Sequence, residues 1–110
     1  PGRPAIAAFE QVNFDDDVVG VLSIGNMGDC YVELGNYSEA LNHFESAASR
    51  ASSGLAETIL APMFLFKAAI VQIELGDSKG AKENLDQIVS DYPKSQQFSS
   101  AKGLAISLTK

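Results

Sequence analysis

GDCYVELGNYSEALNHFESA, residues 28–47, is the stretch that decides the fold. Leu34-Gly35 predicts the end of a helix, because glycine adopts the left-handed conformation of a helix C-terminus at the least steric cost. Asn36 follows as an N-cap for the next helix, and Glu39, three residues later, completes the pattern of a capping box. The stretch therefore predicts a helix, a tight turn and a second, antiparallel helix.

Small side chains in the same stretch mark where the two helices touch. Gly28 on the first helix and Ala40 on the second allow the two backbones to approach closely. Tyr31 and Phe44 are large enough to fill the space beside that contact. We therefore expect the two helices to pack directly against each other.

The chain repeats this pattern further along. Leu34-Gly35 recurs as Leu75-Gly76, an offset of 41 residues. The same offset relates further pairs: Ala40 to Ala81, Phe44 to Leu85, Ala47 to Ile88 and Glu33 to Glu74. An earlier partial copy consists of Ala5, Phe9 and Val12, which lie 35 residues before Ala40, Phe44 and Ala47. A fixed period of this kind is typical of stacked helical repeats.

The spacing resembles the tetratricopeptide repeat, whose pattern is W-x2-L-G-x2-Y, then A-x3-F, then P. The first full unit reads Ile24-x2-Met27-Gly28-x2-Tyr31, then Ala40-x3-Phe44. The second reads Leu65-x2-Ala68-Ala69-x2-Gln72, then Ala81-x3-Leu85, and ends at Pro93. The family period is about 34 residues, so we expect about seven extra residues around 52–58, in a longer helix or an inter-repeat loop.

The resemblance implies an all-α fold, a superhelix of stacked antiparallel helix hairpins with about six helices. We expect helices near 4–13, from the Asp15–Asp17 run to Leu34, over 37–51, up to Leu75, over 78–91, and from a Ser95 cap to Leu108. Pro62 should start or kink the fourth of these, with an irregularity near Ala61. The single domain, 1–110, then divides into the second helix of a truncated repeat (1–16), a repeat (17–54), a degenerate repeat (55–93) and a C-terminal capping helix (94–110).

Charge and composition exclude several classes of function. The formal net charge of -6 repels phosphate backbones, so we expect no nucleic-acid partner. The most apolar window, 60–73, is too short and too polar to cross a bilayer, so a membrane contact could come only through upstream sequence. A single cysteine, Cys30, can form neither an intrachain disulfide nor a thiolate cluster for zinc.

The sequence also shows no group of residues suited to catalysis or to metal binding. His43, the only histidine, has only Glu39 and Ser46 as polar neighbours within one helical turn and is expected at the surface. Cys30 is expected to pack as a small apolar residue. Asp29 and Glu33 share a helix face, but no third ligand accompanies them. We therefore predict no enzyme activity, no cofactor and no metal.

The resemblance also implies a binding groove lined by the first helix of each pair. By register, the groove residues of this chain are Asn26, Asp29, Glu33, Met63, Phe66, Lys67, Ile70 and Glu74, together with Leu22 and Gly25. Some family members hold a peptide carboxylate with a lysine and asparagines; the equivalent first-unit positions here carry Gly25, Asn26 and Asp29, so we expect no such carboxylate clamp. Apolar side chains beside carboxylates suit an apolar or basic peptide segment; alternatively, Phe66 and Ile70 are only inter-repeat core.

The predicted function is a non-catalytic protein-protein interaction module that binds such a segment in its concave groove. The alternative is a structural or oligomerising scaffold. An unpaired N-terminal helix would expose Ile6, Phe9 and Val12, so the chain would form a homodimer or belong to a longer repeat array. The sequence is also similar to bacterial cell-envelope members of the family, which suggests the periplasmic side of the envelope, with the cytoplasm as the other location.

Overall fold

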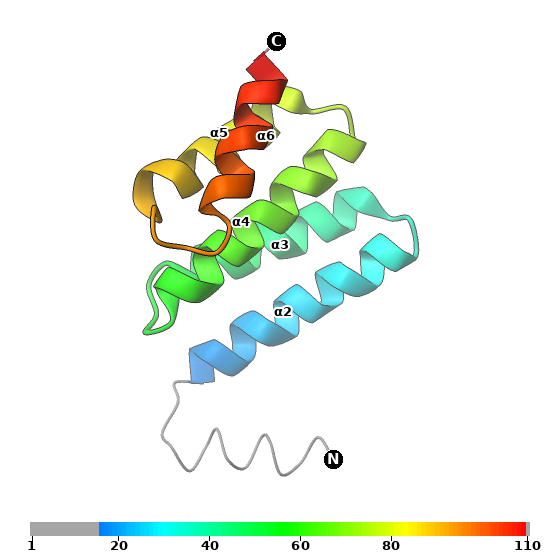
Figure 1. Cartoon of the computed structure of the whole chain (residues 1–110). Coiled ribbons are helices and arrows are strands. Elements are labelled where there is room, and N and C mark those ends of the chain that lie inside the picture. The colour runs from blue at the N-terminus through cyan, green and yellow to red at the C-terminus, as the bar shows by residue number, and fades with distance from the viewer. Residues whose placement is uncertain (1–15, 110) are drawn as a thin grey trace.

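The computed structural model describes residues 16–109, which form five α-helices and no strand. They are α2 (Asp16–Glu33), α3 (Tyr37–Ala51), α4 (Glu57–Glu74), α5 (Ser78–Asp91) and α6 (Phe98–Thr109). Each helix packs against the next one along the chain. Figure 1 shows α2, α4 and α6 in a front layer and α3 and α5 behind them. The expected helix near 4–13 lies outside the described residues.

The turns after α2 and α4 confirm that each Leu-Gly pair ends a helix. Gly35 and Gly76 have φ angles of 75° and 81°, in the left-handed region. The N–H of Asn36 donates to the Tyr31 carbonyl at 2.8 Å, and the equivalent bond in the second hairpin, from Asp77, is also 2.8 Å. Both turns are therefore Schellman motifs, in which the residue after glycine satisfies a carbonyl in the last turn of the helix.

The residue after each of these glycines also caps the next helix. Asn36 Oδ1 accepts a 3.4 Å hydrogen bond from the Glu39 N–H, and Asp77 Oδ1 accepts a 2.9 Å bond from the Gly80 N–H. The reciprocal half of the expected capping box is not formed, because the Asn36 N–H already donates to Tyr31.

Glycine and phenylalanine determine how closely the helices approach. A Cβ on Gly28 would lie only 2.5 Å from the Phe44 ring, so α2 and α3 touch where expected. A Cβ on Gly25 would collide with Phe64 of α4. The Phe44 and Phe64 rings stack with their centroids 6.4 Å apart. The expectation that Gly25 lines the groove is therefore wrong, because the Phe64 ring covers it.

Helix α4 differs from the predicted helix at its start. It begins at Glu57 and continues through Pro62, which is fully buried, so Pro62 does not start it and the helical assignment is unbroken at Ala61. Proline in the second turn removes a single helical hydrogen bond, the one that the Thr58 carbonyl would accept.

The extra residues expected around 52–58 do not form a long inter-repeat loop. Five residues, 52–56, connect α3 to α4, and six residues, 92–97, connect α5 to α6.

Helix α6 begins at Phe98, and the Ser95 hydroxyl is buried without a hydrogen-bond partner in the described structure, so Ser95 is not the expected cap. The first turns of α4 therefore lie beside a loop instead of a helix.

One buried tyrosine links the two ends of the second hairpin. The Tyr92 hydroxyl, just after α5, donates a 2.7 Å hydrogen bond to Glu57 Oε2, in the first turn of α4. Burial, followed by this bond and the negative charge of Glu57, raises the pKa of Tyr92 to about 12. The protonated hydroxyl is thus part of the folded structure.

We predict opposite effects of the same substitution at two helical glycines. Gly28→Ala should lower the free energy of unfolding by about 1 to 2 kcal/mol, because the displaced Phe44 ring costs more than alanine gains in helix propensity. Gly103→Ala is the matched control: its Cβ meets nothing within 4 Å, so it should raise that free energy by up to about 1 kcal/mol. Urea denaturation measures both, and equal effects would contradict the close contact.

The raised pKa of Tyr92 predicts a pH dependence of stability. Tyrosine in the unfolded chain loses its proton near pH 10, so the contribution of Tyr92 is complete below about pH 10 and is lost as the pH rises towards about 12. Compared with Tyr92→Phe, the unmodified chain should lose about 1 to 2 kcal/mol more between about pH 9 and pH 11.5. Denaturation of both proteins across this range measures the difference; parallel curves would show that folding does not raise the pKa of Tyr92.

Candidate functional site

The front layer of the molecule exposes an apolar stripe along its central helix. Ile59, Met63, Phe66 and Ile70 recur at intervals of three or four residues and so lie on one side of α4. Ile59 is 69% exposed and Ile70 41% exposed, whereas Met63 and Phe66 are partly buried. We call this row the α4 stripe. It lies over two separate hollows of the surface.

The first hollow, the α2–α4 hollow, lies between the C-terminal halves of α2 and α4 and has a volume of about 410 Å³. It is lined by side chains of three helices: Asp29 and Val32 of α2, Tyr37 and Phe44 of α3, and Phe66, Lys67, Ile70, Val71 and Glu74 of α4. Most of this lining is apolar or aromatic, so the hollow can bury an apolar side chain.

An ion pair joins the two walls of the α2–α4 hollow. Lys67 Nζ lies 2.8 Å from Asp29 Oδ1, and the ammonium group lies 5.7 Å from the centroid of the Phe44 ring. Both side chains of the pair are more than a third exposed, so the pair contributes less than about 1 kcal/mol to stability. Its main effect is to neutralise Asp29 within the hollow.

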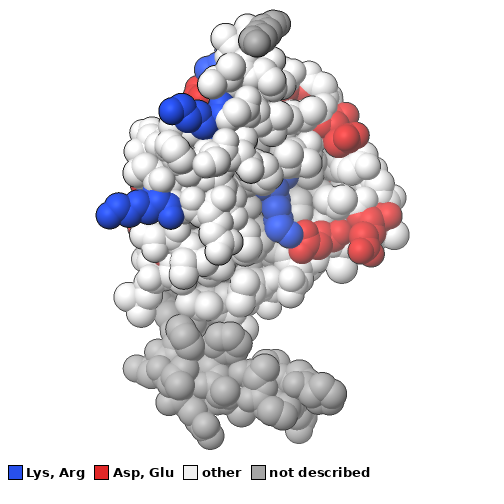
Figure 2. Space-filling view, in the orientation of Figure 1, with Lys and Arg blue, Asp and Glu red and all other residues white. Residues whose placement is uncertain are grey.

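The negative charge that remains is at the helix ends. Glu33 and Glu74 are the last residues of α2 and α4; both are exposed, and neither helix has a basic residue in its last turn. Carboxylates at the carbonyl end of a helix add to the negative end of its dipole and favour a cation there. Figure 2 shows acidic side chains gathered along the right-hand edge of this face, beside broad uncharged areas.

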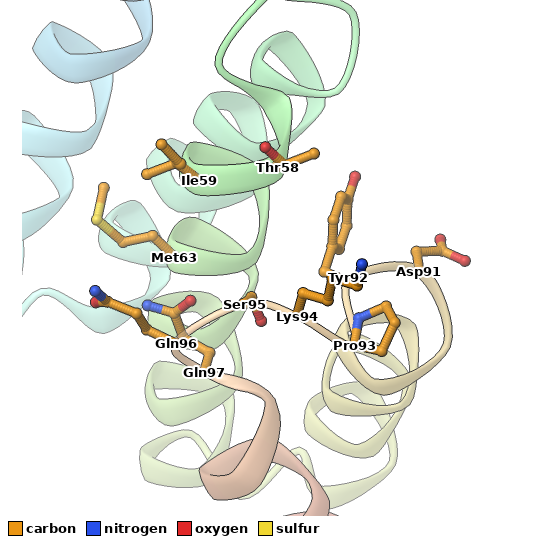
Figure 3. A pocket seen from close by; sticks show the side chains of 10 residues that line it. All are labelled: Thr58, Ile59, Met63, Asp91, Tyr92, Pro93, Lys94, Ser95, Gln96 and Gln97. Carbon is orange, nitrogen blue, oxygen red and sulfur yellow. The ribbon is translucent and has the colours of Figure 1, made fainter.

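The second hollow, the α4–loop hollow, lies between the first turns of α4 and the connection 92–97, and its volume is about 590 Å³. Ile59 and Met63 project from the same side of α4, above Gln96 and Gln97 of the connection (Figure 3). The lining also includes one acidic and one basic side chain, Asp91 and Lys94. Unlike the acidic end of the first hollow, this one is balanced in charge.

The structure gathers most of the groove residues named from the sequence, although not in one place. Of the eight, Asp29, Phe66, Lys67, Ile70 and Glu74 line the α2–α4 hollow and Met63 lines the α4–loop hollow. Asn26 and Glu33 are exposed on α2 and line neither. Leu22 packs against the core.

Sequence reasoning missed several residues that line these hollows, and three of them, Tyr37, Phe44 and Ile59, are instructive. Tyr37 and Phe44 belong to α3, the second helix of its hairpin. The register used to predict the groove considered only the first helix of each hairpin, so it could not identify them. Ile59 carried a signal that was not used, because it lies four residues before Met63 on the same helix face.

Two residues considered for chemistry differ from expectation. His43 is partly buried rather than on the open surface: its Nδ1–H donates to the Glu39 carbonyl at 2.8 Å, and its ring lies 5.1 Å from that of Tyr31. Cys30 is exposed rather than packed. Within residues 16–109, no three His, Cys, Asp or Glu side chains lie together so that they could hold a metal ion. Over the same residues, no helix combines the length and the apolar character needed to cross a bilayer.

Comparison with known proteins identifies the family. The family model described as tetratricopeptide repeat matches residues 26–53 and 64–95, which is more than half of the chain and includes the turn and the second helix of each hairpin. A search of the curated proteins and a search of the solved structures each found no match. Repeats of this family generally mediate protein-protein interactions as non-catalytic modules. Because this model matches two helical hairpins, each with a glycine after its first helix, the chain belongs to the tetratricopeptide repeat family.

Proposed function

We propose that the chain is a non-catalytic module that captures a segment of another protein in the α2–α4 hollow. The segment would place an apolar side chain against Phe66 and Ile70 and basic side chains beside Glu33 and Glu74. The observation that carries this proposal is an apolar hollow with the exposed carboxylate of Glu74 in its lining and a second exposed carboxylate, Glu33, at the end of the neighbouring helix α2.

Apolar burial would supply most of the affinity. An aliphatic side chain moved from water into such a hollow contributes about 1.5 to 3 kcal/mol. The hollow already has its floor, formed by the buried Phe44 ring, so little rearrangement is needed before binding. A short segment buries less surface than a standard interface, and we expect dissociation constants on the order of micromolar.

Electrostatics would supply selectivity. The net charge of -6 and the acidic helix ends steer basic segments towards this face and repel acidic ones. Because Glu33 and Glu74 are exposed, added salt should screen this contribution. The Asp29–Lys67 pair leaves no lone cation in the hollow to attract a carboxylate.

Substitutions in the hollow should separate the two contributions. We would select binders from a displayed library of random peptides of about 16 residues, long enough to form roughly 24 Å of helix. Selected peptides should pair apolar residues with Lys or Arg. Ile70→Asp should weaken their binding at least about tenfold, or about 1.4 kcal/mol, and the double variant Glu33→Lys, Glu74→Lys should weaken it several-fold at low salt. Fluorescence polarisation measures both effects.

Ile106→Asp is the matched control for these variants. Ile106 is 53% exposed on α6 and lines neither hollow, so this variant should bind as the unmodified chain does. Selected peptides that bind all of these proteins equally would contradict the assignment of the α2–α4 hollow as the binding site.

A further inference from the structure

We propose that the captured segment is an amphipathic α-helix that lies along the α4 stripe and covers both hollows. This inference rests on the proposed function and specifies its ligand. The α4–loop hollow, to which the sequence assigned only Met63, would then be the second half of one binding groove.

The geometry of the stripe is the first argument. From Ile59 to Ile70 the four apolar side chains span eleven residue steps, or about 17 Å of helix. Ile59 and Met63 line one hollow, and Phe66 and Ile70 line the other. Single exposed apolar side chains are ordinary on protein surfaces. An unbroken row that connects two hollows is instead the surface against which an amphipathic helix packs.

The connection between α5 and α6 explains why the stripe extends so far. Helix α6 begins at Phe98, so a loop and not a helix lies beside the first turns of α4. As a result, Ile59 remains 69% exposed, above an open volume of about 590 Å³. A segment that filled only the α2–α4 hollow would leave this part of the stripe in water.

Hydrogen bonding favours a helix over an extended segment. Between Ile59 and Ile70, α4 itself carries one polar side chain, Lys67, which is paired with Asp29. Gln96 and Gln97 lie only beside the Ile59 and Met63 end of the stripe. The N–H and C=O groups of an extended peptide placed there would lack partners on α4, and each buried unpaired group costs about 1 to 3 kcal/mol. A helix satisfies its own backbone groups and presents only side chains to the stripe.

The charges at the two ends of the stripe give the bound helix a polarity. Glu33 and Glu74 lie at the end where α2 and α4 terminate, whereas the lining at the opposite end contains one acidic and one basic side chain, Asp91 and Lys94. The carboxylate of Glu57, also at that end, accepts the Tyr92 hydroxyl bond and lies outside the lining of the hollow. The ligand helix should therefore carry Lys or Arg near the end that lies over Glu33 and Glu74 and have a nearly neutral other end.

The test uses the peptides selected on the unmodified chain, with Ile59→Asp as the decisive variant. The inference expects apolar residues at helical spacing over at least about three turns in these peptides. Ile59→Asp and Ile70→Asp should each weaken binding at least about tenfold, and Ile106→Asp should not. Circular dichroism should show that the peptide gains helix on binding, and a proline at its centre should weaken binding at least about tenfold.

The other outcomes distinguish the two proposals. Peptides that tolerate a central proline and bind Ile59→Asp normally, yet fail on Ile70→Asp, would overturn the helix while leaving the proposed function intact. Peptides indifferent to both variants would overturn both proposals. Light scattering without peptide tests a further occupant: a dimer of the unmodified chain that Ile59→Asp converts to monomer would mean that a second copy covers the stripe, and would overturn the inference.

Discussion

The contact between Gly28 of α2 and Phe44 of α3 is the constraint on which the rest of the structure depends. Only a residue without a side chain leaves room for the ring, which is 1% exposed. The same ring stacks on Phe64, and Phe64 in turn covers Gly25. Because packed interiors tolerate little displacement, two rings and two glycines determine how α2, α3 and α4 are spaced. Phe44 also forms the floor of the α2–α4 hollow, so this packing shapes the candidate site as well.

The second hairpin keeps the register of the first with different chemistry. Where the first has Gly28 and Phe44, the second has Ala69 and Leu85, both fully buried. The Cβ that alanine adds at the first position is matched by a smaller side chain, leucine in place of phenylalanine, at the second. Where the first has the rings of Tyr31 and His43, the second has Gln72 and Asn84, joined by a 2.7 Å hydrogen bond. The amides have to occur as a pair, since a buried amide without a partner loses about 1 to 3 kcal/mol.

The sequence predicted those features that depend on neighbouring residues. The ends of α2 and α4 follow from Gly35 and Gly76, because a left-handed turn is a local requirement. The register likewise placed five of the eight proposed groove residues around one hollow. Features that depend on distant partners were missed. The burial of Gly25 requires knowing that Phe64 lies above it, and Pro62 continues a helix that starts five residues earlier, where Glu57 bonds to Tyr92.

The walls of the α2–α4 hollow differ between the two units far more than the turns do, and we propose that this difference selects the segment that the module binds. By register, Asn26 corresponds to Lys67 and Asp29 to Ile70, whereas Glu33 and Glu74 are identical. Lys67 of one hairpin pairs with Asp29 of the other, so the charge of each wall is cancelled by its neighbour. Only the repeated glutamates at the helix ends keep their charge. Asp29 thus acts on the groove through Lys67: without it, an ammonium group would stand in the apolar hollow and favour acidic segments over basic ones.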